Sequence, residues 1–221
     1  DLHKTIYLLY ILRVTLILFR QFHLNSLMYF IAISICVPLF FAINLFIDLW
    51  YEGSIQTNIF IGAAFSLYLF GFIIKIPITT YVSAAGLFKE TKKCAITDTV
   101  INLILSFVLV WKFGICGVVF ATFISVFIAE YIMKNLIIHK YVFKESSLHF
   151  YLKNLRFVVI LIFDLFFSYL VINMVNIPNI FTWFLFFFTY FSLNTLFIYF
   201  IFKTLKENNF VNRFNYLIKK G

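Results

Sequence analysis

Residues 58–81 read NIFIGAAFSLYLFGFIIKIPITTY, a long apolar run in which Lys75 is the only charged residue. A transmembrane helix needs about 20 consecutive apolar residues, whereas a membrane barrel strand needs about 10 residues that alternate in polarity. This run is long enough for a helix and does not alternate. Because a helix satisfies its own backbone hydrogen bonds in lipid, residues 58–81 are predicted to cross a membrane as a helix.

The composition extends this prediction to the rest of the chain. Of the 221 residues, 63% are hydrophobic and 12% are charged, and 33 are Phe. Soluble domains average about 45–50% hydrophobic and about 25% charged residues. One soluble core could not cover so many apolar side chains, which excludes the soluble enzymes and soluble binding modules. We therefore expect an integral, all-α membrane protein surrounded by a lipid bilayer.

Five further apolar runs resemble the first one. Together the six runs are residues 27–47, 58–81, 95–110, 115–133, 157–175 and 180–202. The predicted fold is therefore a polytopic bundle of six transmembrane helices over residues 26–203. The short gaps between the runs leave no room for a separate soluble domain.

Two segments flank the six runs. Residues 1–25 contain an apolar stretch too short to span comfortably, so they form either an interfacial helix or a truncated span. Residues 204–221 are expected to form a cytoplasmic amphipathic tail, because Phe210, Phe214 and Leu217 share one helical face. Because the chain begins with Asp1 and not with Met, we expect it to be a piece of a longer protein.

The basic residues predict how the spans are oriented. Nearly all of the 18 Lys and Arg residues lie in the N-terminal segment, in the second and fourth gaps, or in the tail. Lys and Arg gather in the cytoplasmic loops of multi-pass proteins, so both termini are predicted to be cytoplasmic. The same placement in alternate gaps explains the net charge of +9 without a nucleic-acid partner.

Two opposite charges lie inside the apolar runs. Lys75 in the second run and Asp164 in the fifth would both lie roughly 10 Å below the cytoplasmic interface, at about 1.5 Å per residue. Charged groups within a membrane usually face the bundle interior or a wet cavity, so one hypothesis pairs them on a substrate pathway. The other is that Lys75 extends to the lipid headgroups while Asp164 is protonated.

The third run carries a polar stripe, Asp98, Asn102 and Ser106, at helical spacing. Such a stripe turns away from lipid, either to hydrogen-bond a neighbouring helix or to line a substrate cavity. Asp98 and Asn102 are candidate substrate-pathway residues, although Ser106 fits interhelical bonding better.

The fourth run and two prolines predict architectural features. Gly117, Ala121 and Ser125 form a small-residue face that lets another helix approach closely, so the third and fourth runs should pack as a hairpin. Pro38 and Pro77 are expected to kink the first and second spans.

No residue pattern predicts catalysis or a metal site. The 3 Cys and 4 His are scattered, and the sequence has neither an HExxH pair nor a glycine-rich phosphate loop. We therefore expect a protein that is not an enzyme and has no metal or other cofactor. Its energy source would be an ion gradient of H⁺ or Na⁺, the gradient of the substrate, or another subunit.

Several short segments together resemble a known family. Residues 49–53 read LWYEG, residues 83–89 SAAGLFK, residues 101–106 INLILS and residues 113–122 FGICGVVFAT. In order and spacing, they resemble the second half of the Wzx-type polysaccharide flippases, MATE-like members of the multidrug/oligosaccharidyl-lipid/polysaccharide exporter superfamily. The resemblance covers roughly residues 38–144.

The resemblance implies that the six runs are the C-terminal lobe of a two-lobe transporter whose N-terminal half is missing here. Such flippases move undecaprenyl-diphosphate-linked oligosaccharide repeat units across the bacterial inner membrane for O-antigen or capsule. Lys75 would then meet the diphosphate, with Asp164 as its partner when no substrate is bound.

Three alternatives remain open. A multidrug or organic cation antiporter would have the same fold. An O-antigen polymerase would be an enzyme with similar spans, but it would normally need a large external loop. The chain could also be the remnant of a decayed gene.

Overall fold

The chain folds into helices throughout the part that the structure describes. The structure is a computed structural model and describes residues 2–50, 59–144, 146–172 and 179–205, but not the side chains of residues 2–20 and 22. The elements are α1 (Leu2–Trp50), α2 (Ile59–Ala85), α3 (Phe88–Phe113), α4 (Ile115–Val126), the π-helix η1 (Phe127–Met133), α5 (Lys134–Ile138), the π-helix η2 (His139–Phe143), α6 (Leu148–Ile172) and α7 (Ile180–Thr204). The described residues contain no strand.

Six of these helical segments are long and apolar enough to cross a membrane. They are His23–Trp50, Ile59–Ala85, Phe88–Phe113, Ile115–Phe143, Leu148–Ile172 and Ile180–Thr204. The shortest have 25 residues, which at about 1.5 Å per residue exceeds the roughly 30 Å thickness of the hydrocarbon core. The predicted all-α, multi-pass bundle of six transmembrane helices is confirmed.

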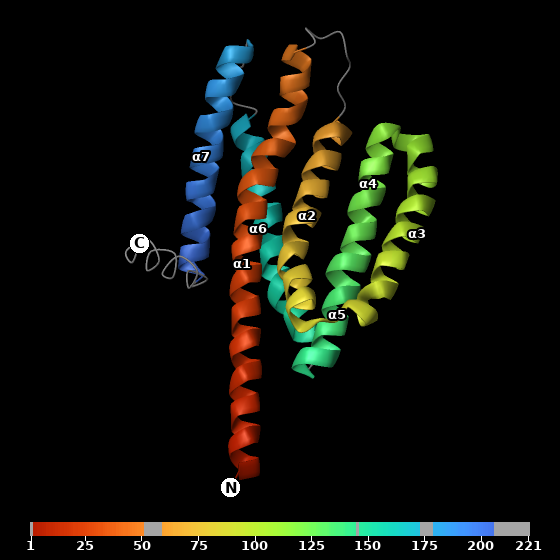
Figure 1. Cartoon of the computed structure of the whole chain (residues 1–221). Coiled ribbons are helices and arrows are strands. Elements are labelled where there is room, and N and C mark those ends of the chain that lie inside the picture. The colour runs from red at the N-terminus through yellow and green to blue at the C-terminus, as the bar shows by residue number, and fades with distance from the viewer. Residues whose placement is uncertain (1, 51–58, 145, 173–178, 206–221) are drawn as a thin grey trace.

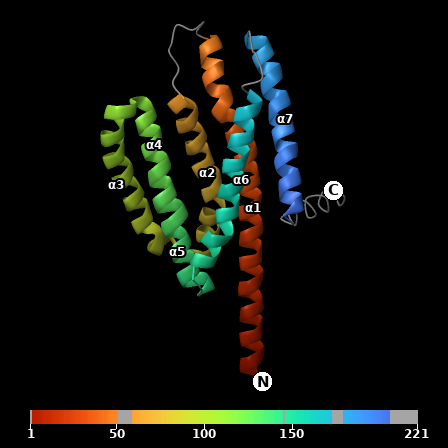
Figure 2. The same cartoon turned by 180° about the vertical axis from the view of Figure 1, so that it is seen from behind.

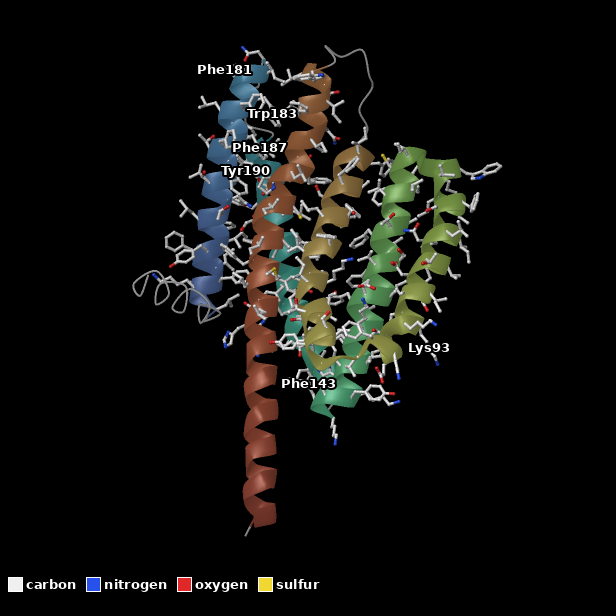
Figure 3. The ribbon with its side chains drawn as sticks, viewed as in Figure 1. Lys93, Phe143, Phe181, Trp183, Phe187 and Tyr190 are labelled. Atoms are coloured by element: carbon white, nitrogen blue, oxygen red, sulfur yellow. The ribbon has the colours of Figure 1, made fainter. Side chains whose placement is uncertain are left out.

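The connections alternate between two ends of the bundle (Figure 1). At the upper end of the view α1 leads to α2, α3 to α4 and α6 to α7. At the lower end lie the N-terminus, the α2–α3 connection, the connection into α6 and the end of α7. Lys93 in α3 also lies at the lower end, where Figure 3 labels it.

The helix α1 is central to the bundle and packs against α2, α6 and α7. From the front, α7, α1, α2, α4 and α3 stand side by side, and α6 lies behind α1 and α2 (Figure 1). Figure 2 shows α6 from the other side, in front of them. A layer of four aromatic rings joins α1, α6 and α7: Tyr29 stacks on Phe157 at 4.7 Å between ring centroids, Phe157 stacks on Phe202 at 5.4 Å, and Phe202 contacts Phe30 at 5.6 Å.

The N-terminal segment continues the first span as one helix. α1 has 49 residues, and its span-forming part is His23–Trp50. Residues 2–20, which the sequence analysis kept apart as an interfacial or truncated segment, are helical and project below the other helices (Figure 1). The predicted amphipathic tail, residues 204–221, lies outside the described residues beyond Leu205.

Helices α3 and α4 form a closely packed hairpin. The turn between them is Gly114, whose φ of +58° is a left-handed conformation that glycine adopts without strain. A Cβ on Gly117 would lie only 2.3 Å from the backbone oxygen of Leu109, so α4 meets the α3 backbone directly at this point. Ala121 and Ser125, further along the same face of α4, are completely buried.

Both prolines that were expected to kink spans lie inside helices, Pro38 in α1 and Pro77 in α2. Proline lacks a backbone N–H and removes one hydrogen bond of the helix. Figure 1 shows that α1 is not straight in its upper, orange part. Near this part, Asn44 of α1 accepts a hydrogen bond of 3.1 Å from the backbone N–H of Gly62, in the first turn of α2.

Candidate functional sites in the membrane

Lys75 is half-buried and lies beside the face of α2 that leaves Phe72 exposed. Its Nζ atom is 5.1 Å from the centroid of the Phe72 ring, at a distance typical of a cation–π contact. Phe72, Tyr68 and Phe65, which precede it along the same side of α2, are all exposed. A cation in this position is accessible to a ligand that approaches α2 from outside the lobe.

Asp164 lies elsewhere in the bundle, at the interface of α6 with α7. Its side chain is completely buried, on the face of α6 that also buries Phe157 and Ser168. The side chain of Asn194 from α7 lies beside its carboxyl group. The structure forms no ion pair between Asp164 and Lys75, although it describes both residues. The two charges that the sequence analysis considered as a pair therefore have different neighbours.

The polar stripe of α3 faces α4. Asn102 donates hydrogen bonds from Nδ2 to Thr122 Oγ1 at 3.1 Å and to Ser125 Oγ at 3.3 Å. The Ser106 hydroxyl donates to Asn102 Oδ1 at 3.2 Å. Asn102 thus joins the two helices of the hairpin, and Ser106 bonds to the same amide from within α3. Asp98, one turn away, has a buried Oδ1 atom without a hydrogen-bond partner in the described part of the chain.

A buried hydrogen-bond network that the sequence analysis missed connects α1 to α6 and η1. Asn25 Nδ2 donates to Asn154 Oδ1 at 2.7 Å, and Asn154 Nδ2 donates to the Tyr131 hydroxyl at 3.1 Å. The hydroxyls of Tyr131 and Tyr29 are 2.8 Å apart. One turn below, Gln21 Nε2 donates to Asn135 Oδ1 at 3.3 Å.

A pattern in the sequence could have indicated this network. Gln21, Asn25 and Tyr29 follow one another at four-residue spacing, like the stripe of α3. Their partners lie more than 100 residues away, so spacing alone could not identify them.

The π-helix η1 holds an acidic residue that the sequence analysis also passed over. Glu130 is buried and forms an ion pair with Lys134, one turn further along. Single turns of π-helix inside α-helices are frequent at functional sites. Here the pair lies near Cys94 of α3, at the lower ends of α3 and of the fourth span.

An apolar groove of about 410 Å³ lies between α1, α2 and α6. Its walls are aliphatic and aromatic except for one hydroxyl of Ser66, one of Tyr169 and the thiol of Cys36. The lining residues are Cys36, Val37, Phe40, Phe41, Ile59, Ala63, Ser66, Leu67, Phe70, Leu161, Leu165 and Tyr169. A groove with this lining suits a hydrocarbon chain, because it offers few hydrogen bonds and no charge.

A metal site is not among the features that the described residues form. No group of three or more His, Cys, Asp or Glu side chains gathers in that part of the chain in a way that could hold a metal ion. The features that the structure does form are the half-buried Lys75, the buried Asp164 group, the network on α1 and the apolar groove. Comparisons with protein families, with characterised proteins and with solved structures found no match to this chain.

Proposed function

We propose that this chain is the C-terminal lobe of a two-lobe transporter that carries a lipid-linked oligosaccharide across the bacterial inner membrane. The substrate would be an undecaprenyl-diphosphate-linked repeat unit of O-antigen or capsule, moved from the inner to the outer leaflet. The family resemblance of residues 38–144 is one support for this proposal. A multi-pass bundle without a soluble domain in its short gaps is another.

The observation that carries the proposal is the position of Lys75 relative to the apolar groove. The groove follows α2 from Ile59 to Phe70. Lys75 comes five residues after Phe70, which is about 7.5 Å further along the helix axis toward the basic end of the bundle and about 140° around it, on the side of Phe72. A polyprenyl diphosphate has the matching order of parts, an apolar chain followed by an anionic group.

The same observation favours this substrate over the alternatives. A half-buried lysine within the membrane-spanning part of α2 attracts an anion and repels an organic cation, which disfavours a drug antiporter. An O-antigen polymerase would need catalytic residues on a large external loop, and few residues separate Trp50 from Ile59, Phe113 from Ile115 and Ile172 from Ile180. Transport also fits a lobe that leaves one face of α2 uncovered for a second lobe.

The proposal includes an orientation. We place the lower end of Figure 1 in the cytoplasm, because the basic residues around Lys93 gather there. Reporter fusions at Lys144 and at Gly114 would test this orientation. Cytoplasmic activity is expected at Lys144 and periplasmic activity at Gly114, and the reverse pattern contradicts it.

Substitution of Lys75 in the complete protein tests the function. Lys75→Ala and Lys75→Glu should stop display of the surface glycan and cause lipid-linked single repeat units to accumulate in the inner leaflet. Lys75→Arg should retain most of the export, because the positive charge is kept. Lys89→Ala is the control, since Lys89 is also basic but is exposed and follows the end of α2. Normal glycan in the Lys75→Ala strain would exclude the proposed role.

A further inference from the structure

One face of α6 changes from basic to aromatic along its length. His149, Lys153 and Arg156 follow one another at the i, i+4, i+7 spacing of one helical face, in the lower part of the helix. Phe163 and Phe167 continue the same face further up. Lys153 and Arg156 are half-buried, whereas both phenylalanines are exposed. We call these five residues the α6 stripe.

The aromatic part of the stripe meets α7. The Phe197 ring of α7 stacks on Phe167 at 5.0 Å between ring centroids and on Phe163 at 6.3 Å. Phe163 nevertheless keeps 53% of its surface exposed and Phe167 keeps 44%. The line along which α6 and α7 meet is therefore open to the surrounding lipid and presents apolar rings to it.

The basic part of the stripe lies beside the end of α7. Phe157 of α6 stacks on Phe202 of α7 at 5.4 Å, so these two residues are at the same level. Arg156 precedes Phe157 in the chain, and its guanidinium carbon lies 4.9 Å from the centroid of the Phe157 ring. Lys203 follows Phe202 and is exposed. Both helices thus place a cation at the level of this pair of rings.

The charge at this end of the three neighbouring helices is positive. In the described residues of α1, α6 and α7 the only acids are Asp48 and Asp164. Asp48 lies at the other end of α1, and Asp164 lies eight residues above Arg156, which is about 12 Å along the helix axis. Lys153, Arg156 and Lys203 therefore produce a potential that attracts an anion.

The stripe lies on the opposite side of α6 from the apolar groove. Leu161 and Leu165 face the groove. At about 100° per residue, Arg156 is about 140° around the helix from Leu161, and Phe163 is about 160° from Leu165. A ligand on the stripe would therefore leave the groove unoccupied.

The order of the parts selects the kind of ligand. A phosphate suits the lower part, because the Arg guanidinium can form two parallel hydrogen bonds with phosphate oxygens and Lys adds a point charge. An acyl chain suits the upper part, which offers exposed rings and no charge. Basic pockets between transmembrane helices bind the headgroups of anionic lipids. A zwitterionic phospholipid carries its own cation and would gain less from three basic side chains.

We propose that the α6 stripe binds one anionic phospholipid of the surrounding bilayer, such as phosphatidylglycerol. Arg156 and Lys203 hold its phosphate, and Lys153 adds a third positive charge. One acyl chain lies over Phe163 and Phe167 along the meeting line of α6 and α7. The bound lipid would connect these two helices from the membrane side, whether or not the chain carries a glycan substrate.

Lipid binding to the purified full chain in detergent tests this site, with native mass spectrometry to count the bound molecules. Phosphatidylglycerol is compared with phosphatidylcholine of identical acyl chains and with inorganic phosphate. We expect one phosphatidylglycerol per chain, bound about tenfold or more tightly than phosphatidylcholine, because each basic residue near a membrane surface strengthens the binding of anionic lipid. Inorganic phosphate should neither bind nor displace the lipid at the same concentration.

Substitutions locate the site on the chain. Lys203→Ala should weaken phosphatidylglycerol binding about fivefold, and Arg156→Gln at least as much, while Arg156→Lys should retain most of it. Phosphatidylcholine binding should change little in all three variants. Lys92→Ala is the matched control, since Lys92 is an exposed lysine near the lower end of α3. Lys203 is exposed, so its variant decides the question if Arg156→Gln does not fold.

Four results would overturn the proposal. They are equal affinities for the two phospholipids, unchanged affinity in Lys203→Ala, an equal loss in Lys92→Ala, and displacement of the lipid by inorganic phosphate. Undecaprenyl phosphate is added as a competitor, and its displacement of phosphatidylglycerol would also contradict the proposal, because the stripe would then bind the transported lipid. No glycan export is measured, so failure here is separate from failure of the flippase proposal.

Discussion

Asn25 of α1 and Asn154 of α6 are joined by a side-chain hydrogen bond of 2.7 Å, and both residues are buried. Asn154 uses its other polar end to donate to Tyr131 of η1, so three elements meet at one amide. The bond connects residues 129 positions apart in the sequence. Together with the Asn154–Tyr131 bond, it holds the lower part of α1 to α6 and η1.

Substitution of these two asparagines by leucine should show energetic coupling. Asn154→Leu removes two hydrogen bonds and leaves the Asn25 amide without a partner, so it should lower stability by about 1–2 kcal/mol. Asn25→Leu should cost less, because Asn154 keeps its bond to Tyr131. The double variant should be less destabilised than the sum of the single ones, by about 0.6 kcal/mol or more. Thermal unfolding of the purified chain measures all three.

The control for this cycle is Leu24→Ala, since Leu24 lies beside Asn25 but is exposed. It should change the melting temperature little in either background. Strict additivity of the two asparagine substitutions would show that the bond contributes nothing to stability.

Gly117 and Gly71 allow a matched test of how closely each helix packs against its neighbour. A Cβ at Gly117 would lie 2.3 Å from the Leu109 backbone oxygen, whereas a Cβ at Gly71 would lie 2.9 Å from the Phe123 ring. A side chain can rotate away but the α3 backbone cannot, so Gly117→Ala should be destabilised by about 1–3 kcal/mol more than Gly71→Ala. The melting temperatures of the two variants measure the difference. Equal melting temperatures would show that α3 and α4 move apart to accommodate the added methyl group without loss of stability.

The sequence predicted some of these features because they depend on local patterns. Span number and helical class follow from apolar runs that exceed the bilayer thickness. The small residues of α4 mark a face of close approach, and Gly117 and Ser125 do lie in the α3–α4 interface. The stripe Asn102–Ser106 was interpreted as either bonding or cavity lining, and its hydrogen bonds run to α4 and within α3.

Other features depend on which helices are neighbours, and no local pattern contains that information. Lys75 and Asp164 were matched by their depth along two helices, but depth does not determine the direction in which each side chain points. Asp164 shares its buried face with Phe157 and so turns toward α1 and α7. Gln21 and Asn25 were assigned to a separate segment because the apolar stretch before them is too short to span a membrane, although α1 continues through them.

Substitution of Asn102 distinguishes a role in helix packing from a role on the substrate pathway. Asn102→Leu removes two interhelical hydrogen bonds, each worth about 0.6 kcal/mol in membrane proteins, so a loss of about 1 kcal/mol is expected. If Asn102 only joins α3 to α4, glycan export by the complete protein should persist at normal protein levels. Export that fails while the melting temperature and protein level are unchanged would place Asn102 on the substrate pathway. Ser106→Ala, which loses one bond to the same amide, is the control.

Filling the apolar groove tests its role independently of Lys75. Ala63 lines the groove on α2, and Ala63→Phe would occupy part of its roughly 410 Å³ with a rigid ring. Ala84→Phe introduces the same side chain at an exposed position near the end of α2 and serves as the matched control. Photolabelling of the purified chain with a diazirine analogue of undecaprenyl phosphate should fall about tenfold in Ala63→Phe, the change expected for a loss of roughly 1.4 kcal/mol of binding free energy. It should be unchanged in Ala84→Phe. Equal labelling of the two variants would mean that the polyprenyl chain binds elsewhere, and the uncovered face of α2 around Phe65, Tyr68 and Phe72 would be the next place to label.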